Sequence, residues 1–576
     1  MADLVAPRDD WFVALPDCPA ADAAAARLIA PDRLVVRHPS GRPWLVGRWA
    51  AEQLALTERP GVRTAQLGLP PGPHHVVSAT GEQVRVRGTA CGLRRVCHAR
   101  VAGVVVASDH ARVLAAAVGA GPDPAAVAGL LFAPVAPYPL CGDSLWRHVV
   151  AVPPDHELLV DGAGPARTSR WWRAPEPVGS LTDGAARLRD QLRAAVALRV
   201  QPGQRVSADL SGGVDSTALC FLAVERGADL VTVRVAARDP ASDDPVWAER
   251  AARRLPGEHL VVDPAAVWAQ PPPSAAPSDE PVGGVVTRAV LGQVARLVRQ
   301  HGSRLHLAGY GGDELVGVSR VYLADLLPYR PSLVLRHLRG HRALRRWSLA
   351  VVLRALLDRR SYPRWLADTA AQLCEPRPVD GVPQFGWGGA VRLPPWATGA
   401  AVELVRDRLA RAAQENEPLA ATRAQHRAVA AVWSAAQAAR QLGGAMPGVE
   451  LAVPYLDDAV VDAALAVDLA ERGTPYRYKP LLAEAVRPVL PALPQRRTKA
   501  TFTADGIAGL RGQRSELVAL CDDLQLARLG LVDPDALRAA FVGLDPTGSV
   551  LMAAEHTLSA ELWLREATTG GMVAAA

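Results

Sequence analysis

One heptapeptide limits the possible folds of this 576-residue chain more than any other segment: residues 211–217, with the sequence SGGVDST. A short apolar run ending at Leu210 precedes it, and the helix-forming run Ala218–Ala223 follows. The glycines permit a tight bend and a close approach of the backbone to a ligand. Free N–H groups at a helix start, with the positive end of the helix dipole, favour a polyphosphate. The segment therefore predicts a strand, a phosphate-binding turn and a helix.

Asp215 places a carboxylate beside that turn. A Mg²⁺ ion beside the phosphates would need one or two such hard oxygen ligands. No lysine follows the glycines, so the segment is not a Walker A loop. It is similar instead to the pyrophosphatase-type loop of enzymes that cut ATP between the α and β phosphates. An ordinary Gly-Gly turn between a strand and a helix is the alternative.

Length and composition limit the class of protein. A chain of 576 residues exceeds one ordinary core, so two or more domains are expected. Its 49% hydrophobic content suits a globular protein, and a net charge of +6 at this length does not imply nucleic-acid binding. The basic segment Arg336–Arg346 fits a solvated helix face, with a contact surface for an acidic peptide or partner as the alternative.

The seven cysteines are odd in number and include no CxxC pair, which favours reduced, mostly buried thiols and a cytoplasmic protein. Cys91, Cys97 and His98 lie close together in a spacing that matches no zinc module. The N-terminus has no basic region followed by an apolar core, so no signal peptide is predicted. No apolar run of about 18 residues occurs, so no membrane span is predicted.

Residues 1–175 contain short strand patterns separated by turn residues, which indicates a sheet-rich domain with few helices. One helix is predicted from His110 to Gly119, with Ser108 or Asp109 as its N-cap. Two prolines and a glycine predict a connector over residues 169–179. The predicted strands include Arg33–Arg37, Gln83–Arg87, Val101–Ala107 and Glu157–Val160.

Beyond residue 180, strand and helix patterns alternate, which predicts an α/β fold with a doubly wound parallel sheet. Ligands of such sheets bind at the carboxyl ends of the strands, here the loops after Leu210 and Ala308. From about residue 321 the pattern is helical. The predicted strands are Arg205–Leu210, Leu230–Val235, Glu258–Val262 and Leu305–Ala308, and the predicted helices are Leu181–Val200, Thr217–Glu225, Pro245–Leu255 and Val285–Gln300.

A second glycine-rich turn supports the first. Residues 307–315 have the sequence LAGYGGDEL, again a strand, a turn and an acidic residue. Asp313 would give a second carboxylate across from Asp215. Two carboxylates at adjacent strand ends can hold Mg²⁺ ions that bridge the phosphates and stabilise departing pyrophosphate.

Three later segments complete a pattern: VPYLDD at 453–458, YKPLL at 478–482 and RRTKATF at 496–502. With them the chain resembles the asparagine synthetase family over about 185–510. That family carries a Ser-Gly-Gly-x-Asp-Ser loop, a Gly-x-Gly-x-Asp-Glu loop and a Pro-Phe/Tyr-Leu-Asp turn. It also has a lysine that opens a leucine-rich helix and a lysine before an aromatic residue in a late loop. All five features occur here in the same order.

The resemblance implies two domains: a degenerate class II glutamine amidotransferase-like domain over 1–175 and an ATP pyrophosphatase (PP-loop) synthetase domain with a helical extension over 180–570. It implies ATP and Mg²⁺ as cofactors, with Asp215 and Asp313 as metal ligands. Lys479 matches the lysine that neutralises charge on an adenylated intermediate, with a surface residue at a helix start as the alternative. Lys499 either assists catalysis or is a solvated lysine. The implied ATP-site residues are Leu210, Ser211, Gly212, Gly213, Asp215, Ser216, Val233, Ala308 and Gly309.

The N-terminus departs from the family. Its glutaminase nucleophile is a cysteine exposed by removal of the initiator methionine, whereas this chain has Ala2 there and its first cysteine is Cys18. A thiolate with a free α-amine as base cannot be built from alanine. We therefore expect that this protein does not release ammonia from glutamine. The amine that it uses must arrive with a substrate.

Two further positions depart from asparagine synthetase. Tyr310 stands where that enzyme has a glutamate, and it looks like the tyrosine with which β-lactam synthetase helps to deprotonate an amine. Such a tyrosine needs a charged neighbour to tune its pKa. Gln437 lies near the expected place of that partner, and Glu280 and Glu450 are candidate substitutes. Ala452 replaces an arginine, which argues against free aspartate as substrate.

The chain is most similar to the lasso peptide cyclases, through the lost glutaminase, the Trp171-Trp172 connector and the segments 106–110 and 144–156. This implies an ATP-dependent cyclase that adenylates an Asp or Glu side chain of a leaderless precursor peptide. The peptide's N-terminal amine then closes an isopeptide macrolactam, releasing AMP and pyrophosphate. Expected partners are that core peptide, a leader peptidase and a leader-binding small protein. The alternatives are a β-lactam-type or ammonia-dependent amide ligase on a small molecule, and an inactive nucleotide- or peptide-binding scaffold.

Overall fold

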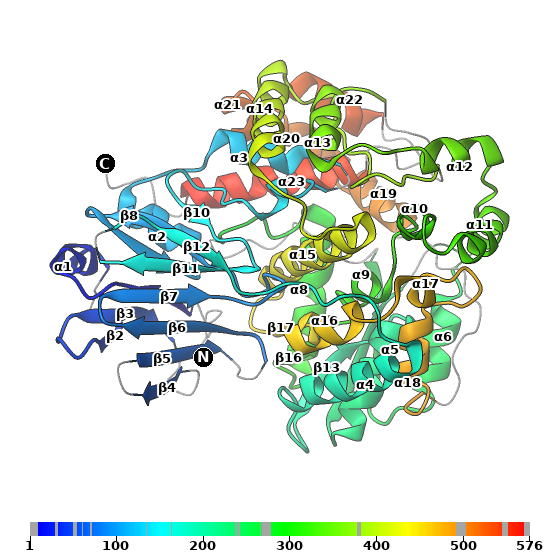
Figure 1. The fold of residues 1–576 in the computed structure, drawn as a ribbon, viewed down its shortest axis with the longest axis horizontal. Helices are drawn as coiled ribbons and strands as arrows, with labels where there is room; N and C mark the ends of the chain where they lie inside the picture. The colour runs from blue at the N-terminus through cyan, green and yellow to red at the C-terminus, as the bar shows by residue number, and fades with distance from the viewer. Residues whose placement is uncertain are drawn as a thin grey trace.

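The computed structural model describes residues 10–28, 33–49, 54–59, 62–68, 72–133, 135–162, 164–236, 239, 242–264, 267, 278–376, 382–490, 503–543 and 551–569. Antiparallel sheets from the N-terminal part occupy one side of the molecule, and a parallel sheet flanked by helices occupies the other (Figure 1). The last helices of the chain lie above and between them, so the C-terminal segment contacts the N-terminal part.

The N-terminal part contains two six-stranded antiparallel sheets, ordered β10-β8-β9-β1-β3-β2 and β12-β11-β7-β6-β5-β4. Their facing sides share a core that includes Phe12, Trp44, Val77, Val86 and Leu158. Alternate residues of the inner strands are buried, as the two-residue period of a strand requires. The strands are β1 Trp11–Ala14, β2 Leu34–Arg37, β3 Pro43–Arg48, β4 Leu54–Arg59, β5 Val62–Gly68, β6 His74–Thr80, β7 Gln83–Arg87, β8 Cys97–Val101, β9 Val104–Ser108, β10 Val150–Ala151, β11 His156–Asp161 and β12 Arg167–Arg170.

Two details of the N-terminal prediction are wrong. The predicted strand Val101–Ala107 is interrupted, because Ala102 and Gly103 adopt positive φ angles and form a turn between β8 and β9. The helix α2, Ala111–Val118, starts after His110, which makes no side-chain cap. Asp109 instead accepts a hydrogen bond from the backbone N–H of Phe12 at 2.9 Å, which leaves its carboxylate directed at β1.

The parallel sheet has the order β15-β14-β13-β16-β17, and all its neighbouring strands are parallel. The four predicted strands and four predicted helices are present here, whereas the three-residue β17 is too short to give a sequence pattern. The chain leaves β13 toward β14 on one side and returns to β16 on the other, so the switch point for ligand binding lies between β13 and β16. The elements are β13 Arg205–Asp209, β14 Asp229–Val235, β15 Glu258–Val262, β16 Leu305–Leu307 and β17 Glu450–Ala452, with helices α4 Leu181–Ala197, α5 Val214–Glu225, α6 Asp244–Ala252 and α8 Val285–Gln300.

Helices that follow residue 311 pack on the parallel sheet or on the N-terminal part, and those between residues 321 and 356 form a separate hydrophobic cluster. One continuous core joins strands of the first sheet to helices near the C-terminus, with Trp146 edge-to-face against Trp563 at 5.4 Å between ring centroids. The helices are α9 Gly312–Val316, α10 Tyr322–Leu326, α11 Pro331–Arg345, α12 Leu349–Leu356, α13 Tyr362–Ala371, α14 Gly399–Glu415, α15 Arg423–Gly444, α16 Asp458–Leu465, α17 Leu469–Arg472, α18 Pro480–Val486, α19 Thr503–Gly512, α20 Arg514–Leu520, α21 Gln525–Arg528, α22 Pro534–Val542 and α23 Leu551–Thr569; α1 Pro19–Ala26 and α3 Pro124–Ala128 lie nearer the N-terminus.

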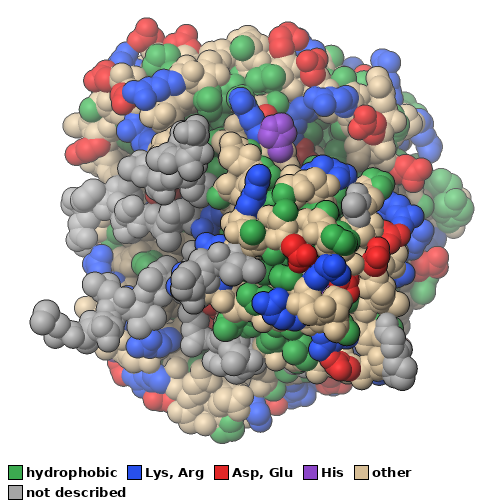
Figure 2. All heavy atoms as spheres, turned by 90° about the vertical axis from the view of Figure 1, so that its left-hand side faces the viewer, with side chains coloured by type: hydrophobic (Ala, Val, Ile, Leu, Met, Phe, Trp, Pro, Cys, Tyr) green, Lys and Arg blue, Asp and Glu red, His purple; other side chains and the backbone are tan. Residues whose placement is uncertain are grey.

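The molecular surface and the cysteines agree with the composition. On the face shown in Figure 2, basic and acidic side chains are interspersed rather than gathered in a broad basic stripe over the part drawn in colour. All seven cysteines are free, and five of them are buried, as the odd count predicts. Within the described ranges, no helix combines the length and the apolar character that crossing a bilayer requires.

A loop of the N-terminal part, residues 88–95, enters the core of the parallel-sheet region. Cys91 belongs to that core, and its thiol donates to the carbonyl of Leu456 at 3.1 Å. The backbone N–H of Ala90 donates to the Asp458 carboxylate at 2.9 Å, and the Trp433 indole donates to the Ala90 carbonyl at 3.0 Å. The N-terminal part is therefore fastened directly to residues 454–458, the turn that leads into α16.

A buried ion pair also stabilises the turn at residues 454–458. The Arg199 guanidinium, just after α4, makes two hydrogen bonds to the Asp457 carboxylate, at 2.5 and 2.8 Å. We expect Arg199→Leu to lower stability by about 3 kcal/mol, because it leaves a buried carboxylate uncompensated. Thermal unfolding midpoints measure this loss. The double variant Arg199→Leu/Asp457→Leu should lose less, and an unchanged midpoint for Arg199→Leu alone would contradict the role assigned to the pair.

The contact between Asp458 and the loop 88–95 is sensitive to pH. Burial, followed by the nearby Asp462 and Asp457 charges, raises the pKa of Asp458 to about 7. A raised carboxyl pKa stabilises the folded state most at low pH, and this contribution is lost as pH rises through 7. Asp458→Asn, whose amide oxygen still accepts from Ala90, should therefore raise the unfolding midpoint at pH 8 by the equivalent of about 1 kcal/mol, with little change at pH 5. Asp161→Asn, an exposed carboxylate on β11, is the control, and equal shifts at both pH values would contradict the prediction.

Candidate active site

The first glycine loop connects β13 to α5 at the carboxyl edge of the parallel sheet. Gly212 has a φ of +82°, and a Cβ added there would lie 2.3 Å from the Asp244 carbonyl oxygen, so only glycine fits. The Ser211 hydroxyl accepts from the Gly213 N–H at 3.2 Å and lies 2.9 Å from the Ser216 hydroxyl. The loop thus folds over the start of a twelve-residue helix, the backbone arrangement that favours phosphate.

The second glycine loop packs directly on the first. A Cβ added to Gly309 would lie 2.9 Å from the Ser216 backbone nitrogen, and one added to Gly312 would lie 2.7 Å from Oδ1 of Asp215. Two segments about 100 residues apart in the chain are therefore in contact. Their glycines are required by this contact and not only by the turns themselves.

Lys479 joins the two acidic residues. Its ammonium forms ion pairs with Asp215 and, at 2.6 Å, with Asp313, and its side chain is 9% exposed. Burial works against the charge, but Asp215 and then Asp313 outweigh burial and raise the pKa of Lys479 well above its ordinary value. Lys479 also adopts a left-handed backbone conformation, with φ +41°, directly before Pro480 opens α18. Lysine rarely adopts this conformation, and here it turns the side chain into the site.

Asp215 is also held through its backbone. The buried Tyr455 hydroxyl donates to the Asp215 carbonyl at 3.1 Å. Burial, with added effects from the Asp215 and Asp313 charges, raises the pKa of Tyr455 well above its ordinary value, so it remains a donor. The Pro-Tyr-Leu-Asp turn has a recognisable sequence pattern, but this contact of its tyrosine does not.

Tyr310 belongs to the second glycine loop, and 40% of its surface is exposed. Desolvation raises the pKa of its hydroxyl above the ordinary range, and the Asp209 and Glu314 charges add to the effect. The hydroxyl is therefore protonated at neutral pH. Asp209, at the end of β13, accepts from the His306 imidazole at 3.0 Å.

The acidic neighbours of Tyr310 differ from those predicted. Glu280 contacts Arg95 and Arg440, and although burial opposes ionisation, these two arginines lower the pKa of Glu280 to about 2. Glu450 pairs with Leu305 at the start of β16, the opposite end of the strand from the loop. The acids whose charges act on Tyr310 are Asp209, at the end of the adjacent strand β13, and Glu314, four residues later in the same segment.

The donor set fits a divalent cation. Asp215 and Asp313 both contact the same ammonium, so their carboxylates face a common point, and hard carboxylate oxygens are the ligands that Mg²⁺ takes. Lys499 lies outside the described residues. Val233 lies within β14, where it pairs with Asp209 at the end of β13. The other predicted nucleotide-site residues follow the carboxyl ends of β13 and β16, and they are Leu210, Ser211, Gly212, Gly213, Ser216, Ala308 and Gly309.

Comparisons with known proteins give one informative result. No curated protein matches the chain. Among solved structures, glutamine phosphoribosylpyrophosphate amidotransferase from B. subtilis complexed with ADP and GMP matches at 9% identity, covering 52% of this chain and 81% of that one; its TM-score of 0.18 is too low to carry an argument. The family model for asparagine synthase matches residues 187–565, which include both glycine loops and Lys479. The chain belongs to the asparagine synthase family, whose members are ATP-dependent ligases that form amide bonds.

Proposed function

We propose that this protein closes a macrolactam in a peptide, as lasso peptide cyclases do. The observation that carries the proposal is the cluster of Asp215, Lys479 and Asp313 at the contact of two glycine loops. Such a cluster suits cleavage of ATP between the α and β phosphates. We assign it to a PP-loop synthetase domain over 180–570, preceded by a degenerate glutaminase-like domain over 1–175.

The thiols of the N-terminal part support the proposal that the substrate supplies the amine and that glutamine does not. Burial raises the pKa of Cys91, Cys97 and Cys141 to about 12 each. A thiol of this pKa is not a thiolate at neutral pH and cannot act as a glutaminase nucleophile. Among the described residues of this part, the remaining thiol, Cys18, is also buried.

In the first step, a side-chain carboxylate of the peptide attacks the α-phosphorus of ATP, and the bond to the β-phosphate oxygen breaks. The products are an acyl adenylate and pyrophosphate. The loop 211–216 binds the leaving pyrophosphate, and Lys479, with Lys499, offsets negative charge at the reacting phosphate. Mg²⁺ held by Asp215 and Asp313 would supply further charge compensation there.

In the second step, the peptide's N-terminal amine attacks the acyl carbon, AMP leaves, and one proton is lost. We assign the proton transfer to Tyr310 acting with Glu314. Burial and the neighbouring Asp313 and Asp215 charges raise the pKa of Glu314, which makes its carboxylate a stronger proton acceptor. Holding amine and adenylate together converts the reaction into an intramolecular one.

A small-molecule ligase of the β-lactam synthetase type is the second candidate, because Tyr310 would serve its ring closure equally well. Under the first proposal the partners are a core peptide, a leader peptidase and a leader-binding small protein. The protein would act in the cytoplasm, without nucleic acid.

Pyrophosphate release tests the reaction. With ATP, Mg²⁺ and a linear leaderless peptide, the wild-type protein should release pyrophosphate and AMP. Asp215→Asn and Lys479→Met should each slow release by about 100-fold or more, because the first removes a proposed Mg²⁺ ligand and the second removes a cation that offsets charge at the phosphates. Arg477→Met is the matched control, since it removes a cation two residues away that pairs with Glu484.

The identity of the triggering substrate separates the candidates. Release triggered only by a small amino acid derivative would favour the second candidate. ADP among the products would overturn both, and absence of any release would favour a nucleotide-binding scaffold.

Tyr310→Phe separates the two steps. The variant keeps the adenylation cluster, so ATP–pyrophosphate exchange should persist, while formation of cyclic peptide should fall by about 100-fold or more. Tyr329→Phe, in a residue that is 82% exposed, is the control. Loss of exchange, or closure at the wild-type rate, would contradict the assigned role.

A further inference from the structure

The helix pair α11 and α12 carries an exposed surface that the proposed chemistry does not use. Residues 329–357 contain seven arginines and no aspartate or glutamate. Both helices bury one side in a shared cluster that includes Val334, Leu338, Val352 and Leu356. The opposite sides face solvent along the edge of the molecule (Figure 1).

The solvent side of this pair is both basic and apolar. On α11, Leu335, Arg336 and Arg339 are exposed at helical spacing, and Leu344 is 66% exposed. On α12, Leu349 and Leu353 are exposed four residues apart, and Leu357, which follows the helix, continues their stripe and is 74% exposed. We call these residues, with Arg354, the α11–α12 surface. Exposed leucines in such a stripe are a feature of interaction sites rather than of ordinary surface.

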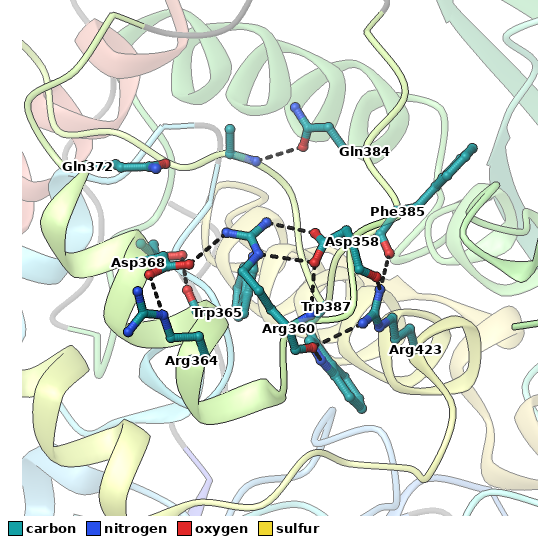
Figure 3. A network of polar contacts seen from close by, with 12 residues as sticks. Asp358, Arg360, Arg364, Trp365, Asp368, Gln372, Gln384, Phe385, Trp387 and Arg423 are labelled. Carbon is teal, nitrogen blue, oxygen red and sulfur yellow. Dashed lines mark hydrogen bonds and ion pairs between the residues drawn. The ribbon is translucent and has the colours of Figure 1, made fainter. Parts of the chain in front are cut away.

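The carboxylates that border the α11–α12 surface are already engaged. Asp358 and Asp368 are both bound by Arg360, and Arg364 also pairs with Asp368 at 3.0 Å (Figure 3). Asp468 pairs with Arg330 at 2.8 Å. In the described part of the chain, no carboxylate forms an ion pair with Arg336, Arg339 or Arg354, so the surface keeps its positive charge.

The base of α12 is also fixed in place. Arg423 of α15 donates to the carbonyls of Asp358, Phe385 and Arg360, and the Trp387 indole donates to the Arg360 carbonyl at 2.9 Å (Figure 3). The helix pair is therefore a preformed surface, which reduces the entropy cost of binding.

The α11–α12 surface is joined to the catalytic lysine. A Cβ added to Gly340 would lie 2.6 Å from the Pro475 ring, and the Tyr476 hydroxyl donates to the Arg336 carbonyl at 2.6 Å. The Tyr322 hydroxyl, in contact with His337 and His341 of α11, donates to the Gly473 carbonyl at 2.9 Å. Tyr476 precedes Lys479 by three residues, a chain length of at most about 10 Å.

We propose that the α11–α12 surface docks an acidic, amphipathic segment of the peptide substrate, an inference that rests on the proposed function. Arginines without carboxylate partners complement acidic side chains, and the leucine stripe of α12 complements an apolar helix face. A polypeptide docked at this edge can continue toward Lys479. A lipid bilayer could cover the same residues, but it would approach the site as a flat sheet and could not enter it.

Fluorescence anisotropy with a defined probe tests the docking without ATP. The probe is a fluorescein-labelled 16-residue peptide of Glu and Leu at helical spacing, and a Lys/Leu peptide of the same pattern is its counterpart. The Glu/Leu peptide should bind in the micromolar range and the Lys/Leu peptide at least about tenfold more weakly, with salt weakening the former. Equal binding of the two peptides would overturn the proposal.

Two surface variants locate the site. Each of two triple variants should weaken binding of the Glu/Leu peptide at least about tenfold. They are Arg336→Gln/Arg339→Gln/Arg354→Gln and Leu349→Ser/Leu353→Ser/Leu357→Ser. Arg187→Gln/Arg253→Gln/Arg254→Gln removes the same charge elsewhere and should leave affinity unchanged. Unfolding midpoints establish that the variants are folded. Unchanged affinity in both surface variants, or binding to 70:30 phosphatidylcholine:phosphatidylglycerol vesicles in place of the peptide, would overturn the proposal.

Catalysis distinguishes this inference from the proposed function. With a linear peptide that carries an acidic segment, the arginine variant should raise KM at least about tenfold with kcat unchanged. Asp215→Asn should keep probe affinity while it loses pyrophosphate release. If no peptide triggers release but the probe still binds at the α11–α12 surface, the proposed reaction fails and the docking surface stands.

Discussion

The ion cluster of Asp215, Lys479 and Asp313 organises the centre of this protein. The side chains of Lys479 and Asp215 are 9% and 10% exposed, and they compensate each other because an unpaired buried charge costs several kcal/mol. Asp313, whose side chain is 47% exposed, brings a second carboxylate to the same ammonium. The three residues come from three distant segments. The loop after β13, the start of α9 and the start of α18 must therefore meet at one point, and the glycines of the two loops allow that approach.

The N-terminal part contributes to this geometry although no reaction is assigned to it. Its loop 88–95 binds Leu456 and Asp458, and Tyr455, directly before Leu456, donates to the carbonyl of Asp215. The chain of contacts passes from an antiparallel sheet to the phosphate loop through a single turn. The N-terminal part therefore helps to position the loop after β13, and its core is continuous with that of the C-terminal helices.

The sequence predicts those parts of the site that depend on local chemistry. Glycine loops, alternating strands and helices, and the lysine before α18 each have a short pattern with a physical reason behind it. Asp209 could not be found in this way, since it approaches Tyr310 only because strands β13 and β16 are adjacent, whereas Glu314 follows Tyr310 by four residues. Glu280, one of the two candidate partners of Tyr310, contacts arginines from the loop before β8 and from α15, which are far away in the chain. The three-residue strand β17 has no sequence pattern at all, and only its pairing with β16 defines it.

The choice of lysine at position 479 follows from the geometry of the cluster. Of the 64 lysine and arginine residues in the chain, only Lys479 and Lys499 are lysines. Arginine presents a planar, extended fork of donors with fixed directions, whereas an ammonium is a compact charge that two carboxylates can approach from different sides. An ammonium on a flexible stem can also move aside when a cation and phosphates enter, while its left-handed backbone, held by Pro480 and by the packing of Pro475 and Tyr476 on α11, stays in place. A fixed backbone with a mobile charge is the arrangement that a site requires when negative charge moves from one phosphate to the next during the reaction.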